Sequence, residues 1–180
     1  RVVCYVNSTA EVKAGSDICC TSANAPEVVR SLGDGEVIFV PDRNLGSHTA
    51  EKLGRSLILW PGFCPAHQRV SAAEIEALRA AHPGAPVLVH PECPKPVRDA
   101  ADFVLSTGQM CRHARQAPER AFIIGTEQGV LCRLRAENPG KTFHLASDRL
   151  FCPDMKKITL EKVLRSLEGM RHRVTVEPAV

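Results

Sequence analysis

The feature that most constrains the fold of this chain is an internal repeat. When the 180-residue sequence is laid over itself with a shift of 85 residues, polar residues fall on polar residues. The matched pairs are Tyr5 with His90, Asn7 with Glu92, Lys13 with Arg98, Asp17 with Asp102, Ser22 with Thr107, and Asp42 with Glu127. The tripeptide Phe-Cys-Pro also occurs twice, with a shift of 88 residues between Cys64 and Cys152. Self-similarity at a fixed period indicates that each copy is one structural unit.

Each copy alternates short apolar segments, typical of buried strands, with amphipathic or capped segments, typical of helices. We predict strands at 2–5, 17–20, 36–40, 56–60, 87–90, 103–105, 121–124 and 142–145. We predict helices at 8–14, 21–32, 45–53, 71–82, 94–100, from 108, at 129–136 and 160–169. Residues 173–177 form either an edge strand or a frayed tail. Strands and helices that alternate at this spacing predict an α/β fold with parallel sheets. We therefore expect two similar three-layer αβα units with small parallel sheets, at residues 1–85 and 86–180.

Composition narrows the partner and the location of the protein. The net charge is only +3, and the chain has one Trp and one Tyr, so a nucleic-acid partner is not indicated. No apolar run reaches the roughly 20 residues that span a bilayer, and the first residues lack the apolar core of a secretory signal. We therefore expect a cytoplasmic protein with reduced cysteines, a small-molecule partner and no membrane contact.

Polar residues follow the first strand of each copy at equivalent positions. Ligands of parallel α/β sheets bind beyond the carboxyl ends of the strands. Tyr5 with Asn7, and His90 with Glu92, should therefore face one shared cleft. The repeat pair Ser22 and Thr107 is expected at helix amino termini. There each residue acts as a simple N-cap or helps to bind an anion, and one residue can do both.

The repeat also sorts the eight cysteines. Three cysteines, Cys4, Cys19 and Cys20, match apolar strand positions and are expected in the core. Three others have no cysteine counterpart and are expected either to pack in the core or to have no particular role: Cys93, Cys111 and Cys132. Only Cys64 and Cys152 match each other, each in a loop after a strand and before a proline.

Two thiolates brought together by internal symmetry favour a soft metal ion or an iron-sulfur cluster. Zinc is less favoured because the paired C-x-x-C motifs of a zinc ribbon are absent. Three roles are open for His67: a further metal ligand, a residue that orients a metal ligand or contacts the substrate, or a polar loop residue. We favour the second role, because the other copy has Met155 at the equivalent position, which does not match a metal-ligand type. A disulfide between Cys64 and Cys152 is the remaining alternative, disfavoured in a reducing compartment.

Seven ordered motifs resemble the quinolinate synthase family over the whole chain. They are YVNSTAEVKA (5–14), CCTSANA (19–25), PDRNLG (41–46), WPGFCPAH (60–67), VHPEC (89–93), GTEQG (125–129) and CPDMKKITL (152–160). The resemblance implies a pseudo-threefold fold of three α/β domains around a 4Fe-4S cluster, with one Cys from each domain. It implies the condensation of iminoaspartate with dihydroxyacetone phosphate to quinolinate, for NAD biosynthesis. An L-aspartate oxidase or dehydrogenase would supply the iminoaspartate.

Carried over by position, the resemblance assigns Cys64 and Cys152 as cluster ligands. The residues it places in the substrate cavity are Tyr5, Asn7, Ser22, His67, His90, Glu92, Ser106 and Thr107. Among these, Glu92, Tyr5 and His90 are the candidate catalytic acids and bases. The family's first domain, with its own cluster cysteine, has no counterpart here, so this chain matches domains 2 and 3. The alternative function is a non-catalytic module that binds an anion or zinc.

Overall fold

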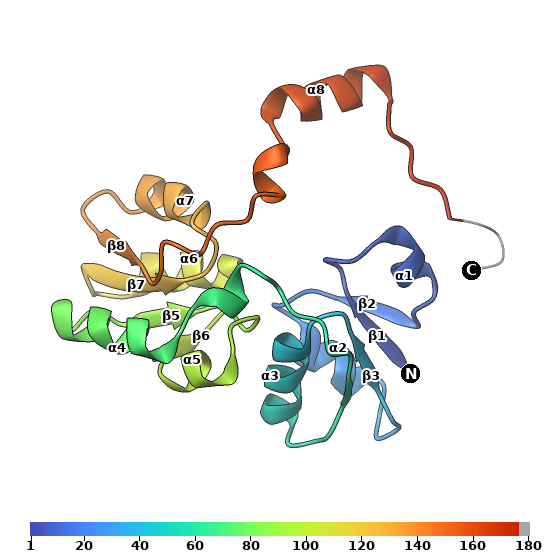
Figure 1. The fold of residues 1–180 in the computed structure, drawn as a ribbon, viewed down its shortest axis with the longest axis horizontal. Coiled ribbons are helices and arrows are strands. Elements are labelled where there is room, and N and C mark those ends of the chain that lie inside the picture. The colour runs from blue at the N-terminus through green and yellow to red at the C-terminus, as the bar shows by residue number, and fades with distance from the viewer. Residues whose placement is uncertain (177–180) are drawn as a thin grey trace.

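The computed structural model describes residues 1–176 and contains two four-stranded sheets (Figure 1). In the first sheet the strand order is β2-β1-β3-β4, and in the second it is β6-β5-β7-β8; every pairing is parallel. The strands are β1 (Val2–Tyr5), β2 (Ile18–Cys20), β3 (Ile38–Val40), β4 (Ile58–Leu59), β5 (Val87–Val89), β6 (Phe103–Val104), β7 (Ala121–Gly125) and β8 (Thr142–Leu145). The identical strand order confirms the predicted α/β fold with two similar units.

Helices connect these strands in the same order in both units. They are α1 (Ala10–Ala14), α2 (Ala25–Ser31), α3 (Arg43–Leu53), α4 (Ala72–Ala81), α5 (Lys95–Asp99), α6 (Thr107–Gln116), α7 (Val130–Glu137) and α8 (Leu160–Gly169). Short 3-10 turns, η1 (His67–Arg69) and η2 (Met155–Lys157), follow the two Phe-Cys-Pro segments. The repeat extends to single hydrogen bonds. Asp17 accepts the N–H of Val2 at 2.7 Å, and Asp102 accepts the N–H of Val87 at the same distance.

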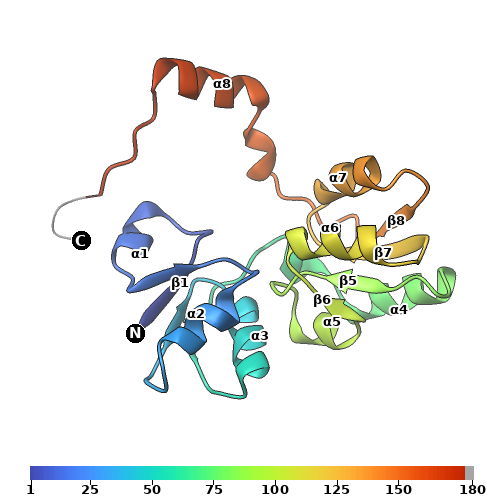
Figure 2. The ribbon, with the colours of Figure 1, turned by 180° about the vertical axis from the view of Figure 1, so that it is seen from behind.

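The second sheet has helices on both faces. Leu88, Phe122 and Ile124 pack with residues of α6 and α7 on one face. On the other face, Ile123 packs in one cluster with Ile75 of α4. Helix α4 lies within the predicted first unit but covers the second sheet (Figures 1 and 2). The boundary between residues 85 and 86 follows the sequence repeat and stays a prediction.

The first sheet is covered less evenly. Its main core cluster, which includes Val3, Val29 and Phe39, lies on the side of α2 and α3. The short helix α1 lies on the opposite side in both views (Figures 1 and 2). Ile38 and Ile58 alternate away from the core cluster, and both are exposed. The third layer of this unit is therefore limited to α1.

Helix α8 is the repeat counterpart of α4, but it lies away from both sheets (Figure 1). Val70, just before α4, is 4% exposed, whereas its counterpart Ile158 is 70% exposed. Ile75 is fully buried, whereas its counterpart Val163 is 43% exposed. The apolar stripe of α8, formed by Leu160, Val163, Leu164 and Leu167, therefore faces solvent.

A capping box starts α4, in which Ser71 and Glu74 cap each other. Arg149 also donates to the Glu74 carboxylate, at 2.6 Å. Burial raises the pKa of Glu74, but hydrogen bonds from Ser147, Ser71 and Arg149 outweigh burial and lower the pKa to about 2.

Two local predictions needed correction, those for Cys19 and for Ser22, and one of the two alternatives for residues 173–177, an edge strand, is not observed in the described part of this segment. Cys4 and Cys20 are buried as predicted, but Cys19 is exposed because β2 is an edge strand and Cys19 points to the open face. Ser22 lies three residues before α2, which begins after Asn24; the Asn24 side chain accepts the N–H and hydroxyl of Thr21. Residues 173–176 form no strand, and residue 177 lies outside the described residues.

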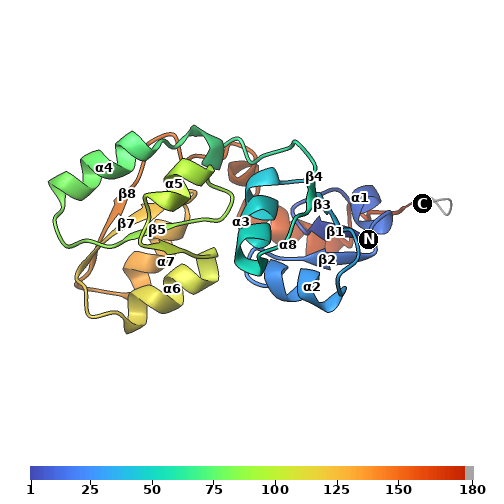
Figure 3. The same cartoon turned by 90° about the horizontal axis from the view of Figure 1, so that it is seen from below.

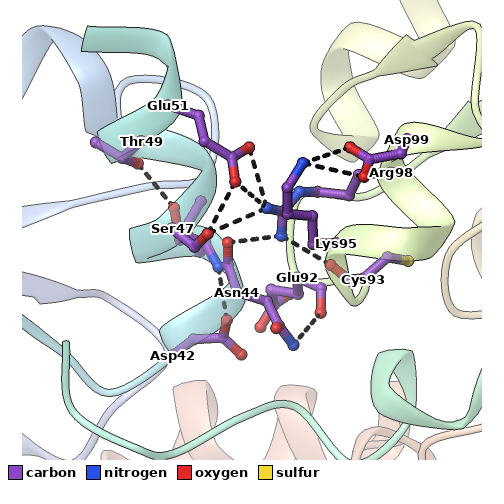
Figure 4. A network of polar contacts seen from close by, with 11 residues as sticks. Asp42, Asn44, Ser47, Thr49, Glu51, Glu92, Cys93, Lys95, Arg98 and Asp99 are labelled. Carbon is purple, nitrogen blue, oxygen red and sulfur yellow. Dashed lines mark hydrogen bonds and ion pairs between the residues drawn. The ribbon is translucent and has the colours of Figure 1, made fainter. Parts of the chain in front are cut away.

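The two units contact each other through α3 and the segment that ends in α5 (Figures 3 and 4). Arg98, the repeat counterpart of Lys13, is buried and donates to the backbone carbonyl oxygens of Asn44 and Cys93, both at 3.0 Å. The Asn44 side chain donates to the carbonyl oxygen of Glu92 at 3.0 Å. Through these bonds, helix α3 of the first unit holds the strand-end loop of the second.

Within residues 1–176, no helix has the length and apolar character needed to cross a membrane.

Candidate functional site

A cavity of about 680 Å³ lies where the two units meet. Most of the side chains that the sequence predicted for the site line it: Tyr5, Asn7, Ser22, Cys64, His67, His90, Glu92, Thr107 and Cys152. They come from both units and follow strands β1, β2, β4, β5, β6 and β8. The carboxyl ends of parallel strands lie at one edge of a sheet. The two sheets therefore bring both sets of residues to one cavity.

Matching carboxylates hold the two cysteine loops. Asp42 caps α3 by accepting the N–H of Leu45 through Oδ1, and it accepts the N–H of Cys64 through Oδ2; both distances are 2.8 Å. In the second unit, Glu127 accepts the N–H of Cys152 through Oε1 at 3.3 Å. The repeat pair Asp42 and Glu127 thus anchors equivalent loops, each of which carries a free thiol.

Three further side chains form a compact cluster beside Cys64. The Nδ1 atom of His67 lies 3.5 Å from Oε2 of Glu92, and Nδ1 of His90 lies 3.1 Å from the same oxygen. The two imidazole rings are stacked with their centroids 4.8 Å apart. The Nε2 atoms form hydrogen bonds across the unit boundary, His67 with Thr126 at 2.9 Å and His90 with Ser22 at 3.2 Å. These bonds fix both rings in the cavity wall.

Burial dominates the electrostatics of the cluster. It lowers the pKa of His67 and that of His90 to about 4, so both imidazoles are neutral at neutral pH. Burial also raises the pKa of the Glu92 carboxyl. Burial and the nearby Glu92 carboxylate raise the pKa of the Tyr5 phenol, and they raise that of the Cys64 thiol to about 11. Desolvation disfavours every charged form, so burial in the cavity wall favours the neutral forms of these groups.

One predicted cavity residue does not line the cavity. Ser106 is buried, and its hydroxyl accepts the N–H of Gln109 as the N-cap of α6, while Thr107 is the first helical residue and lies in the wall. The sequence interpretation also missed wall residues. Asp42, Thr126 and Glu127 line the cavity without having been predicted for the site. The pairing of Asp42 with Glu127 in the repeat was the available signal, and Thr126 lies in the GTEQG motif.

The cavity wall contains two of the thiol groups that an iron-sulfur cluster needs as ligands. Iron in such clusters takes thiolate ligands, and the cavity wall has one half-buried cysteine from each unit. Among the described residues, Cys64 and Cys152 are the cysteines in this wall. The chain thus provides two ligands of this kind, and a bound cation would favour their thiolate forms.

The fold and the cavity define the chain as a parallel α/β protein whose two repeated units share one polar site, with a thiol from each unit. A family model described as quinolinate synthetase A protein matches residues 1–180. The chain therefore belongs to the quinolinate synthetase A family.

Curated relatives agree with this assignment. A quinolinate synthase of Dehalococcoides mccartyi (strain ATCC BAA-2100) is 53% identical over 175 residues, which are 97% of this chain and 58% of the relative. A quinolinate synthase of Alkaliphilus metalliredigens is 51% identical over 180 residues, with 99% and 59% covered. A quinolinate synthase of Geobacter metallireducens is 51% identical over 175 residues, with 97% and 58% covered. The chain spans just under three fifths of the length of these relatives.

Proposed function

We propose that this chain is the part of a quinolinate synthase that carries two cluster ligands and most of the substrate cavity. The whole protein would condense iminoaspartate with dihydroxyacetone phosphate to form quinolinate, phosphate and water. The observation that carries the proposal is the convergence of nine expected site residues, from both units, on one cavity. The family membership supports the reaction type.

Cys64 and Cys152 would each bind one iron of a 4Fe-4S cluster. When bound, the cluster would supply an open iron site that acts as a Lewis acid on the substrate. The carboxylates of Asp42 and Glu127 would hold the two cysteine loops in place through their backbone N–H bonds.

The remaining wall residues would bind the substrates, both of which are anionic. The hydroxyl of Thr107 and the free N–H groups at the start of α6 suit a phosphate or carboxylate, and the Ser106 cap would fix that helix end. Ser22 and Asn7 would contribute polar contacts from the other unit, and His67 would orient the substrate.

His90 and Glu92 are the proposed proton-transfer pair. Their Nδ1 and Oε2 atoms are 3.1 Å apart, so one proton can pass between them. Tyr5 lies in the same wall and would act as a hydrogen-bond donor, since its phenol stays protonated. Enclosure between the two units would exclude water from the reacting atoms.

Two exposed apolar surfaces support the proposal that a further α/β unit completes the site, as the length of the relatives also suggests. One surface is the α1 side of the first sheet, where Ile38 and Ile58 are exposed. The other is the stripe of α8, which includes Val163 and Leu164. Because α4 buries its own stripe on the sheet of the next unit, a third unit would cover α8 in the same way.

Anaerobic reconstitution with iron and sulfide tests the proposal. The chain should develop the broad visible absorbance of thiolate-ligated iron, and Cys64→Ser or Cys152→Ser should each abolish most of it. Cys132→Ser, at an exposed cysteine outside the cavity, is the matched control and should keep the absorbance. A colourless wild-type protein, or equal absorbance in all variants, would refute the assignment of the two ligands.

A further inference from the structure

A second metal-binding arrangement, which shares Cys64 with the proposed cluster, follows from three ligand atoms in the cavity wall. Cys64, His67 and Glu92 each offer one ligand atom, and these atoms all lie within 4.8 Å of one another. Sulfur, imidazole nitrogen and carboxylate oxygen together are a ligand set typical of zinc. We propose that Cys64, His67 and Glu92 bind a single divalent cation of the Zn²⁺ class.

The strongest evidence for the site is the Nδ1 atom of His67. It is buried, and within residues 1–176 it has no hydrogen-bond partner. The side chain of His67 is only 7% exposed, so water does not readily compensate this atom. Buried polar atoms without a partner are rare in folded proteins. A cation at this point would give the nitrogen lone pair a partner.

The other ring nitrogen of His67 already has the contact that orients metal-binding histidines. Its Nε2 atom lies 2.9 Å from the hydroxyl oxygen of Thr126. When Nε2–H donates to this oxygen, the proton is on Nε2 and the Nδ1 lone pair points toward Glu92. Histidine ligands of metals commonly donate their second N–H in this way, which fixes the tautomer and the ring orientation.

The distances fit a tetrahedral ion after a small adjustment. With bonds of about 2.0–2.3 Å to zinc, two ligand atoms of a tetrahedral site are roughly 3.4–3.6 Å apart. The Nδ1 atom of His67 is already 3.5 Å from Oε2 of Glu92. Since the largest separation in the set is within 4.8 Å, movement of about 1 Å closes it, within reach of a small χ rotation.

Three protein ligands leave the fourth position of a zinc ion open, and all three of these residues line the cavity. The site would therefore hold a cation together with water or a small anion. Because Cys64 belongs both to this site and to the proposed cluster, one chain could hold either the ion or the cluster. The two sites differ in Cys152, which only the cluster uses, and in His67 and Glu92, which only the ion uses.

Titration of the metal-free chain with Co²⁺ and Zn²⁺ under anaerobic conditions tests this proposal. We expect one Co²⁺ per chain with sulfur-to-cobalt charge-transfer absorbance, displaced by one Zn²⁺. Cys64→Ser should remove the charge-transfer band, and His67→Gln and Glu92→Gln should each weaken zinc binding at least about 10-fold. Cys152→Ser and Cys132→Ser should bind zinc like the wild type.

The variants also separate the ion from the cluster. Far-UV circular dichroism checks that each variant is folded, and zinc affinity is compared only among folded variants. Zinc binding that depends on Cys152, or that persists unchanged in His67→Gln and Glu92→Gln, would overturn the proposed ion site. Absence of stoichiometric binding by the wild type would overturn it as well. Failure of cluster reconstitution leaves these readouts unaffected, since none of them uses iron, sulfide or turnover.

Discussion

Arg98 offers a sharp test of how the two units are held together (Figure 4). Its side chain is 3% exposed, and it donates to two backbone carbonyl oxygens, those of Asn44 and Cys93. It also donates to Ser47 and forms an ion pair with Glu51 at 3.1 Å. Replacement by methionine, Arg98→Met, keeps much of the apolar stem but removes every one of these bonds.

The cost can be worked out from the partners that remain. A buried group that loses its hydrogen-bond partner costs about 1–3 kcal/mol, and two carbonyl oxygens are affected. The carbonyl of Asn44 belongs near the lower end, about 1 kcal/mol, since it also lies within helix α3, and that of Cys93 near the middle, about 2 kcal/mol. The ion pair adds less than about 1 kcal/mol, because Glu51 is 41% exposed and water solvates it after the change. We therefore expect Arg98→Met to lower the free energy of unfolding by about 3 kcal/mol.

Urea unfolding followed by circular dichroism measures this loss. Arg133→Met is the matched control. Arg133 is 60% exposed, and within the described residues 1–176 its ion-pair partner is Glu137 on the same helix, so the loss should stay below about 1 kcal/mol. A value for Arg98→Met within 0.5 kcal/mol of the control, an order-of-magnitude margin for a surface substitution, would show that Arg98 does not hold the units together.

Three further predictions concern stability. Glu74→Gln should lower the free energy of unfolding by about 0.5–1 kcal/mol at pH 7. The folded pKa of Glu74 is about 2, below its usual value, so this difference from the wild type should shrink as the pH falls from about 4.5 toward 2. A difference that does not change with pH would contradict this explanation. Gly46→Ala should lower the free energy of unfolding in urea by about 1–3 kcal/mol, since the new Cβ would lie 2.6 Å from the Leu59 side chain. The control Gly35→Ala has open space around its Cβ and should be near neutral. Equal losses in the two variants would refute the close packing of α3 at Gly46. Leu164→Gln on α8 should change the free energy of unfolding by less than about 0.5 kcal/mol, and a larger loss would mean that α8 packs on this chain.

The sequence predicted the architecture because the repeat and the alternation of strands and helices are both local patterns. The strand registers then follow from burial of the apolar segments. The sequence repeat placed α4 in the first unit, because this helix precedes residue 86, and did not reveal that it covers the second sheet. Only the chain path after Cys64, which crosses to the second unit, decides this.

Residues that the repeat paired were the ones the sequence could place in one cavity, whereas contacts across the units could not be read from the sequence. Cys64 and Cys152 were identified by their match, and both line the cavity. The partner of His67, Thr126, is 59 positions away in the chain and lies in the other unit, so no spacing rule connects the two. Ser106 was predicted in the wall but caps α6, because a resemblance assigns a position without its side-chain direction.

The central claim is that two repeated units place one cysteine each at a single shared site. An iron anomalous-difference map from crystals of the anaerobically reconstituted chain tests this most directly. We expect one compact group of iron peaks between the two loops, with one iron within bonding distance of the Cys64 sulfur and another within bonding distance of the Cys152 sulfur. Iron density beside only one of these two cysteines, or at separate positions in the two units, would contradict it.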